Sequence, residues 1–128
     1  MNPRVTTDPV VPEHGICFYE IVADDPEATR DFYAKAFGYR FSEATPELGG
    51  AYYADLPEGS IISIRGSMHE QETPVVRVYM RVMDIEAATA QAEADGAMMA
   101  LPPMEIPGRG RIAIYFLGGI QQGIWELP

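Results

Sequence analysis

Two glutamates and an arginine stand in short apolar segments where their side chains could do chemistry. Glu20 and Glu126 could act as general acids or bases, and Arg77 could hold a carboxylate through two parallel hydrogen bonds. Arg77 and Glu126 could also pair with each other, either to bind a ligand or as a permanent internal salt bridge. Glu20 could equally pair with Arg65 or Arg81 and have no chemical role. The sequence leaves these alternatives open.

The remaining chemical candidates carry weaker signals. The only histidines are His14 and His69, and both fall in predicted loops. The run that starts at His69 resembles a metal-binding cluster only superficially, and we expect residues 67–73 to be a solvated linker. The single cysteine, Cys17, falls inside a predicted strand. A buried, inert thiol in a reducing compartment is therefore expected, which indicates a cytoplasmic protein.

The elements that would position these side chains occur twice in the sequence. In each half, a strand is followed by a helix that begins after an aspartate, a favoured N-cap, and ends at a glycine. The first helix lies between Asp25 and Gly38, and the second lies between Asp84 and Gly96. Such repetition indicates that one supersecondary unit is used twice.

Further strands are expected between turns that contain proline and glycine. Their predicted ranges are 51–56, 60–65, 111–117 and 123–127. The repeating unit is therefore a βαβββ module, and the predicted fold class is α+β: two tandem modules form a curved mixed sheet around a concave cavity, with the helices on the outside. We expect one domain over residues 14–128, with module one at 14–67 and module two at 74–128, after an N-terminal arm at 1–13.

The alternation of side chains along each strand predicts which residues face the cavity. In the first strand of module two, Val78, Met80 and Val82 should pack on the helix, so the intervening residues face the other way. The same reasoning across the sheet gives eight cavity residues: Phe18, Glu20, Ser63, Arg65, Arg77, Tyr79, Arg81 and Glu126. Concave surfaces with a few convergent polar groups are typical small-molecule sites.

Composition narrows the range of partners. The formal net charge is -10 with a single lysine, which argues against binding to nucleic acid because phosphate backbones attract Lys and Arg. No apolar run reaches the roughly 18 residues that a membrane-spanning helix requires. A neutral or cationic small molecule suits the acidic chain better, although the charge can also serve solubility alone.

The order of these motifs resembles the vicinal oxygen chelate superfamily, which includes glyoxalase I, bleomycin resistance proteins and extradiol dioxygenases. The resemblance runs from Gly15 to Leu127. Its characteristic stretches are Glu20–Pro26, Phe32–Tyr33, Phe37–Tyr39, Val82–Ala87, Ile106–Arg111 and Gly123–Leu127. The closest likeness is to the glyoxalase-like, uncharacterised subgroup. The resemblance implies the fold described above and a homodimer.

Metal-dependent members of that superfamily hold a divalent ion with four ligands, one from the first and one from the last strand of each module. The matching positions here are Phe18, about Ser63, Arg77 and Glu126. Only Glu126 is a usual ligand, and the guanidinium of Arg77 would repel a cation. We therefore expect no metal cofactor in the usual site.

The resulting functional prediction is a metal-free protein that binds a small molecule, for example to sequester a drug or a metabolite. The alternative is an enzyme of the same superfamily: a lyase, an isomerase or a dioxygenase. Such an enzyme would use one divalent metal through Glu126, or acid and base chemistry at Glu20 or Glu126 without a metal.

Overall fold

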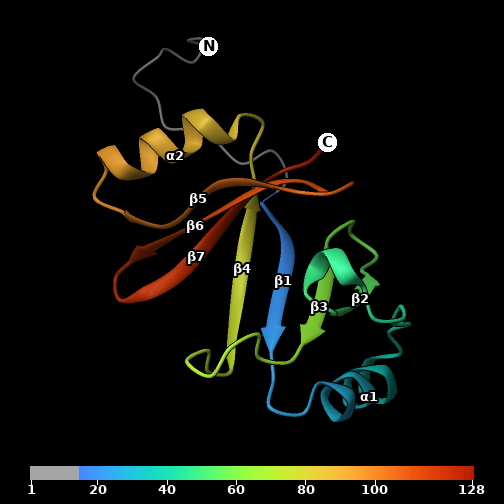
Figure 1. Cartoon of the computed structure of the whole chain (residues 1–128). Helices are drawn as coiled ribbons and strands as arrows, with labels where there is room; N and C mark the ends of the chain where they lie inside the picture. Colours follow the sequence, from blue (N-terminus) through green and yellow to red (C-terminus); the bar gives the residue numbers. More distant parts are fainter. Residues whose placement is uncertain (1–14) are drawn as a thin grey trace.

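The computed structural model of the chain describes residues 15–128. The predicted arm at 1–13 and His14 lie outside the described residues. The elements, shown in Figure 1, are β1 (Ile16–Val22), α1 (Pro26–Phe37), the short 3-10 helix η1 (Pro46–Leu48), β2 (Tyr52–Asp55), β3 (Ile61–Arg65), β4 (Val75–Arg81), α2 (Ile85–Ala94), β5 (Met98–Ile106), β6 (Gly110–Leu117) and β7 (Ile120–Glu126).

All seven strands belong to one mixed sheet with the order β2-β3-β1-β4-β7-β6-β5. The two modules meet where β1 pairs with β4 in antiparallel fashion, and each module contains one parallel pair, β1 with β3 and β4 with β7. The sheet is strongly curved (Figure 1), and it stays open because β2 and β5 form its two separate edges. The predicted α+β fold is confirmed.

Both helices begin and end where the local signals predict. The side chain of Asp25 accepts a hydrogen bond from the amide of Ala28, and the side chain of Asp84 accepts one from the amide of Ala87. At the end of α1, Gly38 has a φ of 74°, a left-handed conformation that glycine adopts without a steric penalty. Helix boundaries follow from contacts a few residues apart, which a sequence pattern reveals directly.

Two of the three buried hydrophobic clusters lie beneath the two helices, and the third, around Phe18 and Trp125, lies on the other face of the sheet. Beneath α2, Val82 and Ile124 pack against Ile85 and Ala88. Beneath α1, the cluster contains Ile21, Ala54, Ile62 and Ile64, with Tyr33 of the helix packed on it. Of the three residues predicted to pack on the second helix, Met80 and Val82 do so, whereas Val78 is not part of this cluster. The polar residues that alternate with these apolar side chains therefore face the concave side.

Two elements differ from the predicted repeat. Strand β5 was not among the predicted strands because Pro102 and Pro103 interrupt its pattern. Proline is tolerated at a sheet edge, and β5 is an edge strand whose register shifts near these residues. In module one, the expected additional strand is reduced to a single bridge between Thr45 and Ala51, so this module contributes three strands to the sheet.

Among residues 15–128, no helix is both long enough and apolar enough to cross a membrane.

Candidate functional site

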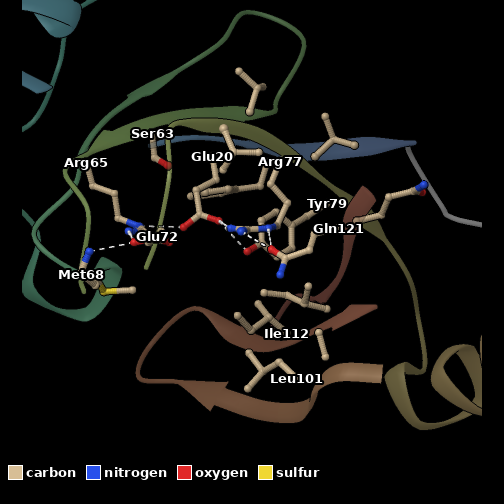
Figure 2. Close-up of a pocket in the computed structure, with 18 of the residues that line it drawn as sticks. Glu20, Ser63, Arg65, Met68, Glu72, Arg77, Tyr79, Leu101, Ile112 and Gln121 are labelled. Carbon is tan, nitrogen blue, oxygen red and sulfur yellow. Dashed lines mark hydrogen bonds and ion pairs between the residues drawn. The ribbon is translucent and has the colours of Figure 1, made fainter. Parts of the chain in front are cut away.

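The concave face of the sheet contains a cavity of about 970 Å³, a volume that suits a drug-sized molecule. Its walls come from both modules. Six of the eight predicted cavity residues line it: Phe18, Glu20, Ser63, Arg65, Arg77 and Tyr79. Figure 2 shows five of these six labelled, together with residues that sequence reasoning did not place there.

One wall of the cavity is aromatic. The rings of Phe18 and Trp125 are stacked, with centroids 4.5 Å apart, and the ring of Tyr79 stands edge-on to both. Ile112 completes this buried cluster, and Leu101 packs against it from β5. Stacked aromatic side chains beside aliphatic ones offer a flat apolar surface, which suits a planar ligand.

A second feature of the cavity is a continuous series of hydrogen-bonded polar side chains with Glu20 at its centre. Glu20 of β1 lies directly opposite Arg77 of β4 in the antiparallel register. One carboxylate oxygen, Oε1, accepts hydrogen bonds from Arg77 Nη1 and from the hydroxyl of Tyr79 at 2.8 Å. The other, Oε2, accepts from Arg65 Nε at 2.9 Å. Three donors from two strands thus hold this carboxylate.

Arg65 extends the series to the loop between the modules. Its two terminal nitrogens donate to the two oxygens of Glu72, at 2.8 and 2.7 Å. The Arg65 guanidinium lowers the pKa of Glu72 to about 2, with a further contribution from the Met68 amide. Burial by itself lowers the pKa of Arg65. The hydrogen bonds and charges of Glu72 and Glu20 raise it by more, so the net pKa of Arg65 is raised. The prediction of a merely solvated linker is therefore wrong at Glu72.

Arg77 extends the series in the other direction. Its Nε donates to Gln121 Oε1 at 3.1 Å, and its Nη2 donates to the same oxygen. Figure 2 shows the amide nitrogen of Gln121 directed towards Ile112. Ile112 and Leu101 form the apolar floor of the cavity. We call the series Glu72, Arg65, Glu20, Arg77 and Gln121 the polar chain.

Tyr79 joins the polar chain to the aromatic wall. Burial, reinforced by the charge of Glu20, raises the pKa of its hydroxyl, so the group remains a neutral donor. Its ring lies against Gly123 of β7, where an added Cβ would come within 2.2 Å of Tyr79 Cδ2. Only glycine at position 123 lets the ring occupy this place.

Two predicted cavity residues lie elsewhere. Glu126 faces the other side of β7, where its Oε2 accepts a hydrogen bond from the amide of Ile85 at the start of α2. The predicted pairing of Arg77 with Glu126 is therefore wrong, as is a cavity position for Glu126. Side chains alternate along a strand, and Ile124 of β7 packs beneath α2. Glu126 therefore shares the α2 side with Ile124, whereas Trp125 faces the cavity.

Arg81 does not line the cavity either. It stands at the last position of β4, paired in register with Trp125, and is not among the residues that line the cavity. Its positive charge acts instead on Cys17. Burial raises the pKa of the Cys17 thiol to about 11, more than Arg81 lowers it, which agrees with the prediction of an inert thiol.

A second contact joins the modules across the concave side. Arg109, in the turn between β5 and β6, donates to Glu47 of η1 at 3.1 Å, and its guanidinium lies 4.7 Å from the centre of the Tyr53 ring. The backbone oxygen of Arg109 accepts from Trp125 Nε1 at 2.7 Å. This turn is thus fixed to both the opposite module and the aromatic wall.

The family model for the Glyoxalase/Bleomycin resistance protein/Dioxygenase superfamily matches residues 15–118. The chain belongs to this superfamily. The match ends before β7, the strand that supplies Gln121 and Trp125 to the cavity.

Among curated proteins, the chain is 24% identical over 114 residues to the anthracycline biosynthesis protein DauV of Streptomyces sp. (strain C5). The same identity holds for the anthracycline biosynthesis protein DnrV of Streptomyces peucetius. Each alignment covers 77% of this chain and 41% of the relative, so the chain spans less than half the length of these proteins.

Solved structures of similar fold include methylmalonyl-CoA epimerase from Mycobacterium tuberculosis, with a TM-score of 0.74 and 16% identity over 98% of this chain and 93% of that one. A hypothetical protein from Bacillus halodurans C-125 has a TM-score of 0.72 and 15% identity, over 88% and 94% of the two chains. At these identities the likeness concerns the fold alone.

The residues of this superfamily member do not fit the divalent metal that its metal-dependent relatives hold. Within residues 15–128, no three His, Cys, Asp or Glu side chains come together as a metal-binding group. Phe18 supplies no donor atom, and Arg77 brings a permanent positive charge. Glu20, the one carboxylate between them, already accepts from two guanidinium groups. An ion there would have to displace these buried cations.

Sequence reasoning missed Glu72, Gln121 and the cavity position of Trp125. For β7 a signal existed, because Gln121, Gly123 and Trp125 alternate and a glycine in a strand often marks a close approach. For Glu72 no pattern was available, since its partner Arg65 lies across a loop whose path the sequence does not determine.

Proposed function

We propose that this protein binds a small molecule with a planar, largely apolar body in the concave cavity, without a divalent metal. The observation that carries the proposal is the pairing of Arg77 with Glu20 inside a cavity of which one wall is the stacked pair Phe18 and Trp125. A guanidinium bound to a carboxylate occupies the position at which a metal-dependent member would hold its ion. The aromatic wall then supplies most of the contact area for a ligand.

The similarity to proteins named for anthracycline biosynthesis supports a polycyclic aromatic ligand. The role that we propose is reversible binding, as in the sequestration of a drug or metabolite. Acid or base chemistry at Glu20 has less support, because both of its oxygens already accept hydrogen bonds from Arg65, Arg77 and Tyr79.

A single tryptophan in the cavity allows this proposal to be tested by fluorescence. Trp125 is the only tryptophan and it lines the cavity, so its fluorescence reports on a ligand at this site. We would titrate chelator-treated protein with 2-(hydroxymethyl)anthraquinone, whose absorption quenches tryptophan emission. The proposal expects saturable quenching at one molecule per chain. Quenching that never saturates, with no rise in melting temperature, would contradict the proposal.

A matched pair of substitutions locates the binding. Phe18→Leu removes the ring that stacks on Trp125, whereas Phe32→Leu makes the same change on α1, where Phe32 is 59% exposed and does not line the cavity. Loss of an aromatic contact is worth about 0.5–1.5 kcal/mol, so Phe18→Leu should weaken binding roughly two- to twelvefold. Phe32→Leu should leave the dissociation constant unchanged. Circular dichroism confirms that both variants are folded.

We also propose a homodimer, which the superfamily resemblance implies. Apolar side chains at the turn between β6 and β7, namely Phe116, Leu117 and Ile120, are exposed, and so is Val76 nearby on β4. Burying such side chains against a second copy would stabilise the assembly. Sedimentation equilibrium should give twice the chain mass of 14.1 kDa. A single-chain mass at high micromolar concentration would refute the dimer.

A further inference from the structure

The polar chain contains as many positive as negative groups. Its two arginines, Arg65 and Arg77, are only 3% and 6% exposed, and they face the two carboxylates of Glu20 and Glu72. Each guanidinium contacts at least one carboxylate, and every carboxylate oxygen accepts from a guanidinium nitrogen. A buried ion is tolerated where it is paired and hydrogen-bonded, and here each ion already is.

An additional charge on a ligand would find no complementary partner in this balanced series. A carboxylate would have to take Arg77 or Arg65 from the glutamate that holds it, and an ammonium would have to take Glu20 from its two arginines. In both cases the charge of the ligand loses water without gaining an uncommitted ion of opposite sign. The balance therefore disfavours charged ligands of either sign.

A neutral donor remains at the end of the polar chain. Gln121 uses its oxygen to accept from Arg77, and its amide nitrogen is directed towards Ile112 (Figure 2). This N–H group can donate to a carbonyl oxygen of a ligand whose flat body lies on the apolar floor. Because the donor is uncharged, such a ligand adds no net charge to the site.

From this arrangement we infer that the cavity selects electrically neutral, carbonyl-bearing aromatic ligands over otherwise identical anionic or cationic ones. The inference rests on the proposed function and specifies its ligand class. The formal net charge of -10 acts in the opposite direction by attracting cations. That attraction is screened beyond about 8 Å at physiological salt, so it affects the rate of encounter more than the affinity inside the cavity.

The test compares three anthraquinones that differ only in one substituent at position 2: a carboxamide, a carboxylate and an aminomethyl group, the last two ionised at pH 7. Quenching of Trp125 gives the dissociation constant of each with the wild-type chain. The inference expects the carboxamide to bind about tenfold or more tightly than either charged form.

Substitution of a glutamate then tests whether the charge balance of the polar chain determines the preference for neutral ligands. Glu20→Gln leaves the polar chain with one excess positive charge, so the carboxylate should gain about tenfold relative to the carboxamide. The matched control is Glu86→Gln, which makes the same change in net charge at an ion pair with Arg111, outside the cavity, where Glu86 is 66% exposed. It should change no preference. If Glu20→Gln does not fold, Glu72→Gln removes the same charge from the same series.

The outcomes separate the two claims. If the carboxylate or the ammonium form binds the wild-type chain as tightly as the carboxamide, selection for neutral ligands is wrong while aromatic binding stands. If Glu20→Gln and Glu86→Gln shift the preference equally, overall charge determines it and the inference also fails. If none of the three compounds quenches Trp125, the proposed function itself is refuted, and the inference is refuted with it.

Discussion

Replacement of Glu72 by glutamine tests whether charge holds the loop between the modules against the sheet. The pKa of Glu72 is lowered from its ordinary value of 4.5 to about 2, chiefly by its two bonds to Arg65. Such lowering corresponds to about 3 kcal/mol of stability at neutral pH as an upper bound. Glutamine retains one acceptor for Arg65 and for the Met68 amide. We therefore expect Glu72→Gln to cost about 2 kcal/mol at pH 7.

The pH dependence provides the sharper test. A carboxylate whose pKa is lowered by folding stabilises the protein above its unfolded pKa, and that stability is lost as the pH falls through the folded pKa. For Glu72 this window runs from 4.5 down to about 2. The stability difference between wild type and Glu72→Gln should therefore fall by roughly half or more between pH 5 and pH 3.

The assay is urea unfolding followed by circular dichroism at several pH values. The control is Glu86→Gln, which breaks an exposed pair with Arg111 and should cost less than about 1 kcal/mol. The reasoning is refuted if Glu72→Gln costs no more than this control at pH 7. It is also refuted if the difference from wild type stays constant from pH 7 to pH 3.

Three further substitutions or reactions test other parts of the structure. Gly123→Ala places a methyl group against the Tyr79 ring, so it should lower the free energy of unfolding in urea by about 1–3 kcal/mol and weaken ligand binding. A variant as stable as wild type would show that the Tyr79 ring is not confined. Because burial raises the pKa of Cys17 to about 11 from 9.0, its alkylation by iodoacetamide at pH 8 should be about a hundredfold slower than in urea, and equal rates would contradict this. Glu126→Ala removes an acceptor at the start of α2 and should cost about 0.5–2 kcal/mol without changing ligand affinity, so weaker ligand binding would argue for a cavity role.

The parts of the fold that depend on local signals were predictable. Asp25 and Asp84 cap the two helices through bonds to amides three residues away, and alternation in β4 correctly separated Met80 and Val82 from the cavity residues. These patterns report contacts made within an element or between an element and the core. The repeat of such signals was enough to predict two modules and a concave face.

The parts of the site that depend on long-range packing were not predictable in the same way. The face that β7 presents to the cavity goes with the close approach of Gly123 to Tyr79; the glycine is a signal in the sequence, but its partner Tyr79 becomes evident only in the assembled sheet. Glu126 was predicted to face the cavity because it matches a metal-ligand position of the superfamily, but it lies on the α2 side of β7. The partner of Arg65 in the loop, Glu72, depends on how that loop folds back. At the centre of the site, Glu20 and Arg77 were each predicted to face the cavity, but their position opposite each other was not predicted.

The central claim is that an arginine–glutamate series takes the place of a metal in this cavity. Calorimetric titration of chelator-treated protein with Zn, Ni, Mn, Mg and, without oxygen, Fe(II) tests it most directly. With Arg77 bound to Glu20, we expect no stoichiometric binding of any of these ions. Binding of one ion per chain at micromolar affinity or better, abolished by Glu20→Ala, would contradict the claim and place a metal in the cavity.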